Sequence, residues 1–200
     1  MNTIRIMLID DEPHVLSALQ RLLRQQSPLP GKTCTIESHS SPLEAIKQAN
    51  ERTYDVFVSD YRMPELDGVE TLRRLRDIQP YSGRILLSGS REFNTVVEAV
   101  NVAQVGRILL KPWNDAELIA AIRDAVETRL LRIENAEMAD QLRVQQGLLS
   151  QQDAELRRIE NLWPGITRVE WNEDGSVCIS EANVILTDWG LLQPKDTPPR

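Results

Sequence analysis

Short apolar runs alternate with amphipathic stretches along the first 125 or so residues of the chain. Four apolar runs and one weakly alternating segment predict five strands, at residues 4–9, 33–38, 56–59, 85–87 and 107–110. Apolar residues at helical spacing predict helices over 13–26, 41–51 and 69–78, through Val96 to Val102, and from Asp115 onward. Strict alternation of strands and helices predicts an α/β fold, a doubly wound five-stranded parallel sheet with right-handed crossovers.

Polar side chains follow four of these predicted strands. Asp10 and Asp11 come after the first strand, Asp60 after the third, Ser88 after the fourth and Lys111 after the fifth. Because the carboxyl ends of parallel strands meet at one edge of the sheet, these residues are expected to lie together. Three carboxylates, a hydroxyl and an amine at one edge of the sheet indicate a functional site.

The chemistry of this edge points to phosphoryl transfer. Neighbouring carboxylates raise one another's pKa unless a cation is present, and hard oxygen ligands suit Mg²⁺ or Mn²⁺. Asp60 could then act as a nucleophile and form an aspartyl phosphate. Lys111 and the Ser88 hydroxyl would bind the other oxygens of the phosphoryl group.

Each residue also has a purely structural explanation. The acids at 10–12 could stabilise the positive end of the first helix, and Asp60 could cap the next one. Ser88 could be a turn residue and Lys111 a solvated surface lysine. We favour the phosphoryl site because the structural explanations require coincidences at four separate strand ends.

Residues 3–127 resemble the receiver domain of bacterial two-component response regulators, the CheY-like domains. The matching features are Asp-Asp-Glu-Pro at 10–13, Asp60 with Met63-Pro64 and Asp67-Gly68 downstream, Ser88-Gly89, and Lys111-Pro112. The resemblance implies a flavodoxin-like receiver over residues 1–127.

By this resemblance, Asp60 accepts a phosphoryl group from a sensor histidine kinase or a histidine phosphotransfer protein. Asp11, Asp60 and the main-chain carbonyl of Arg62 would ligate the metal directly. Asp10 would act through a metal-bound water. Self-phosphorylation and slow self-dephosphorylation at Asp60 would be the only chemistry, so the chain is not expected to be an enzyme in the ordinary sense.

The resemblance also implies a switch, in which Ser88 is the hydroxyl that moves toward the phosphoryl group and Lys111 its ion-pair partner. Many receivers have Tyr or Phe in the fifth strand at the position of Ile108. Because Ile108 is not aromatic, the alternative to an aromatic switch is an output surface that changes through backbone shifts or through the last helix. Arg62 lies beside the path of the hydrolytic water and is expected to alter the lifetime of the phosphoryl group.

Composition narrows the class of protein. The 200 residues carry a net charge of −7, which disfavours a general nucleic-acid binder. Cys34 and Cys178 lack partners at metal-ligand spacing, and this usage fits a reducing cytoplasm. No signal peptide and no apolar run of membrane-spanning length is found, so we expect a cytoplasmic protein without a membrane partner.

The stretch from Asp115 to Trp163 contains no proline, and only Gly147 weakens its helical pattern. We predict one continuous helix, in which residues 128–163 form a coiled-coil extension of the last receiver helix. The apolar core positions of the heptad frame are Leu131, Met138, Leu142, Leu149, Leu156 and Ile159. Asn135, Gln145 and Gln152 occupy other core positions. This seam predicts a parallel homodimer, the alternative being a helix that folds back on its own receiver.

The last part of the chain is predicted to be a small β-hairpin element at 164–192, with a turn at Asp174-Gly175, and a disordered tail at 193–200. No output domain is recognised. We therefore predict a response regulator that signals to an unknown downstream protein by protein–protein contact. The alternatives are a DNA-binding transcriptional regulator and a regulatory subunit of a separate output enzyme.

Overall fold

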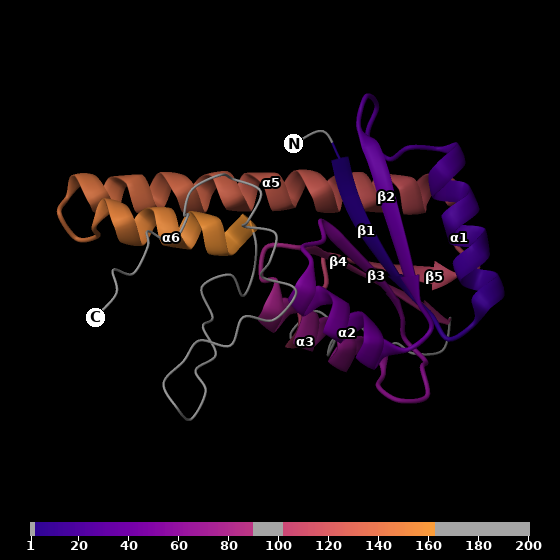
Figure 1. The fold of residues 1–200 in the computed structure, drawn as a ribbon. Helices are drawn as coiled ribbons and strands as arrows, with labels where there is room; N and C mark the ends of the chain where they lie inside the picture. Colours follow the sequence, from indigo (N-terminus) through magenta and orange to yellow (C-terminus); the bar gives the residue numbers. More distant parts are fainter. Residues whose placement is uncertain (1–2, 90–101, 163–200) are drawn as a thin grey trace, which may run out of the picture. The chain divides into compact units, whose positions relative to one another are not determined.

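The computed structural model describes residues 3–89 and 102–162. Five parallel strands form one sheet in the order β2-β1-β3-β4-β5 (Figure 1). The strands are β1 (Thr3–Ile9), β2 (Thr33–His39), β3 (Val56–Asp60), β4 (Gly83–Gly89) and β5 (Arg107–Lys111). The helices are α1 (Pro13–Gln25), α2 (Pro42–Glu51), α3 (Gly68–Ile78), α5 (Asp115–Gln145) and α6 (Gln151–Leu162). The predicted fold class is confirmed. Most of the predicted helix through Val96, the hairpin at 164–192 and the tail at 193–200 lie outside the described residues.

Two apolar layers cover the two faces of the sheet. One layer joins α1 and α5 to the sheet through residues such as Leu19 and Ile122. The other joins α2 and α3 to the opposite face through residues such as Ala49 and Leu72. Successive β3 residues Val56 and Phe57 belong to different layers because side chains alternate along a strand.

Side-chain caps fix where three helices begin. The Ser41 hydroxyl accepts from the amide of Glu44, and the Asp67 carboxylate accepts from the amide of Glu70. Asn114 caps α5 by accepting from two first-turn amides. These residues satisfy amides that a helix leaves unpaired. The caps hold each helix start beside the carboxyl edge of the sheet.

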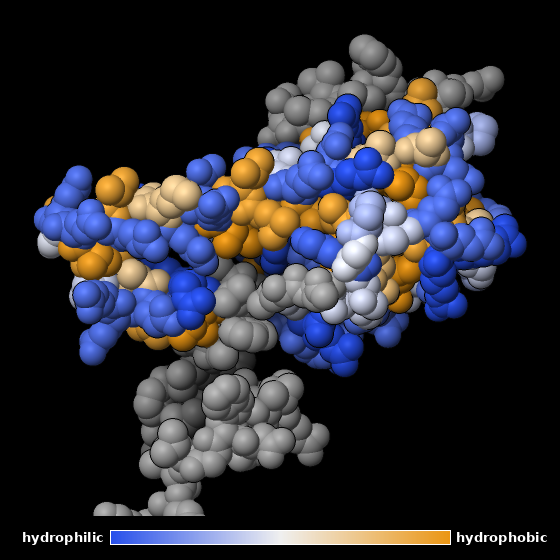
Figure 2. Space-filling model, turned by 90° about the horizontal axis from the view of Figure 1, so that it is seen from above, coloured by the Kyte–Doolittle hydropathy of each residue, from blue (hydrophilic) through white to orange (hydrophobic). Residues whose placement is uncertain are grey.

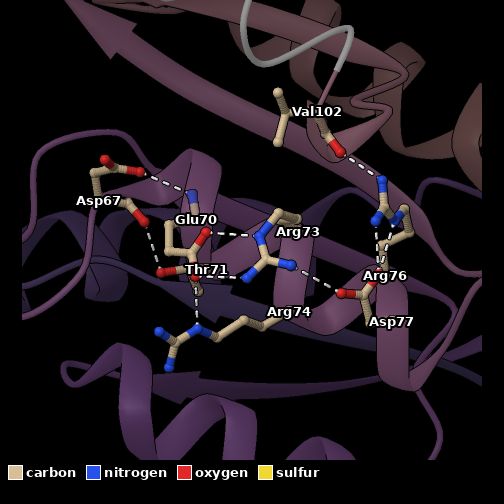
Figure 3. Close-up of polar contacts among 8 residues, drawn as sticks. All are labelled: Asp67, Glu70, Thr71, Arg73, Arg74, Arg76, Asp77 and Val102. Carbon is tan, nitrogen blue, oxygen red and sulfur yellow. Dashed lines mark hydrogen bonds and ion pairs between the residues drawn. The ribbon is translucent and has the colours of Figure 1, made fainter.

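A charged network covers the outer face of α3 (Figure 3). Glu70 accepts hydrogen bonds from Arg73 at 2.7 and 2.8 Å and from Arg74 at 2.8 Å. These hydrogen bonds hold the pKa of Glu70 at about 2, well below its usual value. Arg73 also reaches Asp77 at 3.1 Å. The pairs have the three- and four-residue spacing that stabilises helices in water.

A buried arginine lies at the opposite edge of the sheet. The Arg84 guanidinium donates to the carbonyls of Ala103 and Ser82 at 3.0 and 2.7 Å. Burial lowers the pKa of Arg84 to about 10. Arg76 of α3 donates to the neighbouring carbonyl of Val102 (Figure 3). Together the two arginines hold the chain that leads into β5.

An ion pair marks the point where α5 leaves the sheet. Arg129 lies 2.9 Å from one oxygen of Asp55, whose other oxygen accepts from the amide of Arg5 at 2.7 Å. The Arg129 side chain is only 12% exposed, whereas Leu131 in the next half-turn is 59% exposed. The packing of α5 on the receiver therefore ends close to Arg129.

The prediction of one continuous helix from Asp115 is wrong, because α5 ends at Gln145 and α6 begins at Gln151. Gly147 has a φ of +72°. The amide of Gly147 bonds to the carbonyl of Val144, and the amide of Leu148 bonds to the carbonyl of Arg143. This pattern is a Schellman motif, which ends a helix at a left-handed glycine.

The next helix has its own start signal. The Ser150 hydroxyl accepts from the amide of Asp153 at 3.0 Å and donates to the Asp153 carboxylate at 2.6 Å. After this turn α6 runs back along α5 (Figure 1), and Arg157 comes within 3.5 Å of Asp140. The extension of α5 is therefore a helical hairpin in this structure, and dimerisation through the heptad seam stays a prediction.

Candidate functional site

A lysine links two strand-end aspartates at the carboxyl edge of the sheet. The Lys111 ammonium at the end of β5 lies 2.9 Å from the Asp10 carboxylate and 2.5 Å from that of Asp60. Asp10 is fully buried and Asp60 is 6% exposed. The structure thus brings together three of the residues that the strand-end argument predicted to meet.

The backbone around Asp60 fixes its second carboxylate oxygen. This oxygen accepts from the amide of Arg62 at 2.8 Å. The loop then turns back, and the amide of Gly68 donates to the carbonyl of Tyr61 at 2.8 Å. A Cβ at Gly68 would lie 2.1 Å from the carbonyl oxygen of Asp60. Only glycine therefore fits at the start of α3, because the helix passes directly beside the Asp60 backbone.

Burial and charge act against each other on Asp10. Burial raises the pKa of Asp10, while the hydrogen bond from Lys111 opposes the rise. The other Asp10 oxygen accepts from the amide of Glu12 at 2.9 Å. Burial lowers the pKa of Lys111, but hydrogen bonds to Asp60 and Asp10 outweigh it and the net shift is upward. Lys111 is therefore a cation at neutral pH.

Asp11, unlike the buried Asp10, is partly open to solvent. It is half-buried and lines an open cavity of 530 Å³ beside the β3–α3 loop. The other lining residues are Tyr61, Arg62, Met63, Pro64 and Asp67. The cavity gives an incoming group room next to the loop that follows Asp60.

The predicted switch residues lie on the neighbouring strands. Ser88 is buried near the end of β4, and its hydroxyl donates to the carbonyl of Gly89 at 3.3 Å. Ile108 on β5 is half-buried and packs against the apolar layer of α2 and α3. A smaller aliphatic side chain thus occupies the place where the resemblance leads one to look for an aromatic ring.

The donors at this edge suit a hard divalent cation. The carboxylates of Asp10, Asp11 and Asp60 and the carbonyl of Arg62 offer only oxygen, which Mg²⁺ prefers. Among residues 3–89 and 102–162, no three acidic, His or Cys side chains stand close enough together to form a metal cage.

The strand order and the acidic edge define the CheY-like class of α/β domains. Residues 6–123 match the response regulator receiver domain, and the chain belongs to this family. The resemblance to response regulator receivers, which the strand-end motifs indicated, is confirmed. Receiver domains are signalling domains rather than ordinary enzymes.

Two curated relatives and one solved structure illustrate the similarity. The hydrogenase transcriptional regulatory protein HoxA of Cupriavidus necator is 31% identical over 75% of this chain and 30% of its own length. The response regulator protein TodT of Pseudomonas putida is 26% identical over 76% of this chain and 63% of its own length. The receiver domain of an HD domain-containing protein from Pseudomonas fluorescens is 29% identical, with a TM-score of 0.60, over 67% of this chain and 94% of that one. The chain thus spans less than two thirds of these curated relatives.

Sequence reasoning named the side chains of the site but missed its backbone donors. The amides of Glu12 and Arg62 each hold one aspartate oxygen, and a residue pattern does not reveal where an amide points. The close approach of Gly68 to Asp60 carried one visible signal, the Asp67-Gly68 pair before an amphipathic stretch.

In the described part of the chain, no helix combines the length and apolar character needed to cross a bilayer.

Proposed function

We propose that Asp60 is the phosphoacceptor of a cytoplasmic response regulator, in a reaction that depends on Mg²⁺ or Mn²⁺. The phosphodonor is a sensor histidine kinase or a histidine phosphotransfer protein. The contact of Lys111 with both Asp60 and Asp10 carries this proposal. A half-buried lysine shared by two strand-end carboxylates is already placed to accompany negative charge that arrives at Asp60.

The proposed step is a transfer between two protein side chains. A carboxylate oxygen of Asp60 forms a P–O bond as the P–N bond of the donor phosphohistidine breaks and the imidazole leaves. The amide of Arg62 holds one Asp60 oxygen, so the carboxylate is oriented before the donor arrives. Lys111 and Ser88 then bind phosphoryl oxygens.

The metal has a defined place in this proposal. Asp11, Asp60 and the main-chain carbonyl of Arg62 would hold it directly, and Asp10 would hold it through water. Bound there, Mg²⁺ would offset the negative charge on the transferring group. The chain's own contribution is a set of hard oxygens beside an open cavity lined by Asp11 and Arg62.

The proposed output is contact with a downstream protein through a homodimer. Leu131, Met138 and Leu142 lie exposed along α5 beyond the sheet, which supports a second copy as their partner. Their heptad spacing is that of a coiled-coil seam.

A second candidate function is transcriptional regulation. HoxA is by its name a transcriptional regulatory protein, and TodT a response regulator. A gel shift of the phosphorylated chain against genomic fragments separates the two candidates. Salt-sensitive retardation would favour DNA binding, while free migration would favour output through protein contact.

Replacing Asp60 by Asn tests the phosphoacceptor. With acetyl phosphate and Mg²⁺, intact-mass spectrometry should show one added phosphoryl group on the wild type and none on Asp60→Asn. The matched control is Asp77→Asn on the exposed face of α3, which should be labelled like the wild type. Full labelling of a folded Asp60→Asn protein would overturn the assignment.

A further inference from the structure

The two sides of α5 beyond the sheet have different partners. The side that faces α6 carries half-buried residues, including Ile133, Asp140 and Val144. On the other side, Leu131, Met138 and Leu142 are 59%, 50% and 57% exposed. At 3.6 residues per turn these three lie within about 40° of one another and opposite Asp140. Figure 2 shows hydrophobic residues exposed among hydrophilic ones over this helical region. The stripe formed by Leu131, Met138 and Leu142 is thus at least half exposed in the hairpin.

This stripe is short as long as the hairpin is closed. On α5 it runs only from Leu131 to Leu142, fewer than two heptads, and coiled coils usually need three or four. The remaining apolar core positions, Leu149, Leu156 and Ile159, lie beyond the end of α5. In a continuous helix they would extend the same stripe to about four heptads.

An ion pair and a groove lie between the two helices of the hairpin. Arg157 lies 3.5 Å from Asp140, and small side chains such as Ala154 face the groove of 380 Å³ between the helices. Leu148 and Leu156 stay 73% and 51% exposed in this arrangement. Folding back therefore leaves Leu156 of α6 about half exposed, while Ala154 and Ile159 are half-buried.

We propose that the α5–α6 hairpin is the closed state of a dimerisation switch. In the open state α6 continues α5 as one helix, and a second copy of this chain covers the lengthened seam. This inference rests on the proposed homodimer. It adds that the closed hairpin limits dimerisation, because it shortens the apolar seam. A second copy is the fitting occupant because Asn135, Gln145 and Gln152 at core positions meet their own counterparts in a parallel dimer, where such polar pairs fix register.

Gly147 is the residue on which the two states depend. Its φ of +72° in the hairpin is costly for any side chain, yet a Cβ there would meet nothing within 4 Å. In a continuous helix alanine is favoured over glycine. Gly147→Ala should therefore shift the equilibrium toward the open helix by roughly 30- to 100-fold without a steric clash.

The chain offers a matched control. Gly31 has a φ of +78°, also has nothing within 4 Å, and lies in the connection between α1 and β2. Gly31→Ala introduces the same backbone strain far from the hairpin. It should leave the association of the chain unchanged.

Two measurements on the full chain test the proposal. Spin labels at Gln141 and Arg158, with Cys34 and Cys178 replaced by serine and labelled chains diluted in unlabelled ones, report the hairpin. These positions line the same groove in the closed state and would lie about 25 Å apart along one helix. Light scattering over a concentration series reports the dimer.

We expect Gly147→Ala to show the long distance and to dimerise at a concentration at least tenfold lower than the wild type and Gly31→Ala. An unchanged short distance between the two spin labels in Gly147→Ala would overturn the switch. The dimer seam would still be tested separately, by the mass of the wild-type protein in solution. A long distance in a protein that stays monomeric would overturn both the switch and the proposed homodimer.

Discussion

The receiver and the α5–α6 hairpin use similar apolar residues in different ways. In the receiver, Leu72 of α3 and Ile122 of α5 are fully buried between helix and sheet. In the hairpin, Leu142 of α5 and Leu156 of α6 are more than half exposed. The sheet offers each helix a broad apolar surface, whereas α6 meets only a narrow strip of α5.

This difference shows what determines conformation in each region. Tertiary packing sets the receiver helices, and most helical stability in proteins arises in this way. In the hairpin, local signals decide, because the Schellman glycine Gly147 ends one helix and Ser150 caps the next. A region set by local signals can change state through a single residue.

A pair of leucine truncations should give the largest contrast between the two regions. Leu72→Ala removes a fully buried side chain between α3 and the sheet, and should lower the free energy of unfolding by about 2–5 kcal/mol. Leu156→Ala, at a half-exposed position, should change it by no more than about 0.5 kcal/mol. Urea denaturation measures both. Equal losses would contradict the view that the hairpin packs loosely.

Gly68→Ala tests how tightly the receiver is built around its site. The new Cβ would meet the Asp60 carbonyl oxygen at 2.1 Å, so we expect a loss of about 1–3 kcal/mol in thermal unfolding and weaker labelling by acetyl phosphate. The matched control is Gly106→Ala, whose Cβ would meet its nearest neighbour at an ordinary 3.6 Å. A fully stable, normally labelled Gly68→Ala protein would show that α3 can move away from Asp60.

The smallest effect concerns the surface network of α3. Because the folded pKa of Glu70, about 2, lies below its ordinary 4.5, its pairs stabilise the fold above pH 4.5 and lose this effect as the pH falls toward 2. Glu70→Gln should remove a few tenths of a kcal/mol at neutral pH and flatten this part of the acid unfolding curve. High salt should shrink the difference between the two proteins. A difference that grows at high salt would contradict an ion-pair origin.

Much of the receiver could be predicted because its signals are regular. Four apolar runs and one weakly alternating segment predict the five strands, and the rule that parallel strands end at one edge predicts that Asp10, Asp60 and Lys111 meet. The main-chain amides that orient the two aspartates could not be predicted. Their directions depend on backbone angles that no residue pattern specifies.

The hairpin was missed although its signals are present in the sequence. Gly147 followed by Ser-Gln-Gln-Asp at 150–153 is a helix stop and a helix start in succession. The heptad pattern runs through both signals, and on its own it predicts one continuous helix. The cap signals and the heptad repeat therefore favour different conformations of the same segment.

The contact between Arg129 and Asp55 has a consequence for whatever α5 is attached to. Because the ion pair with Asp55 anchors Arg129 beside the sheet, it fixes the rotational phase of the helix beyond it. Each residue inserted or deleted after Arg129 would turn the following helix by about 100° and move it by about 1.5 Å. The receiver thus sets both the rotation of the attached helix about its axis and its position along that axis. An inserted segment of seven residues would nearly preserve the direction of the apolar stripe, while one of two residues would turn it to the opposite side.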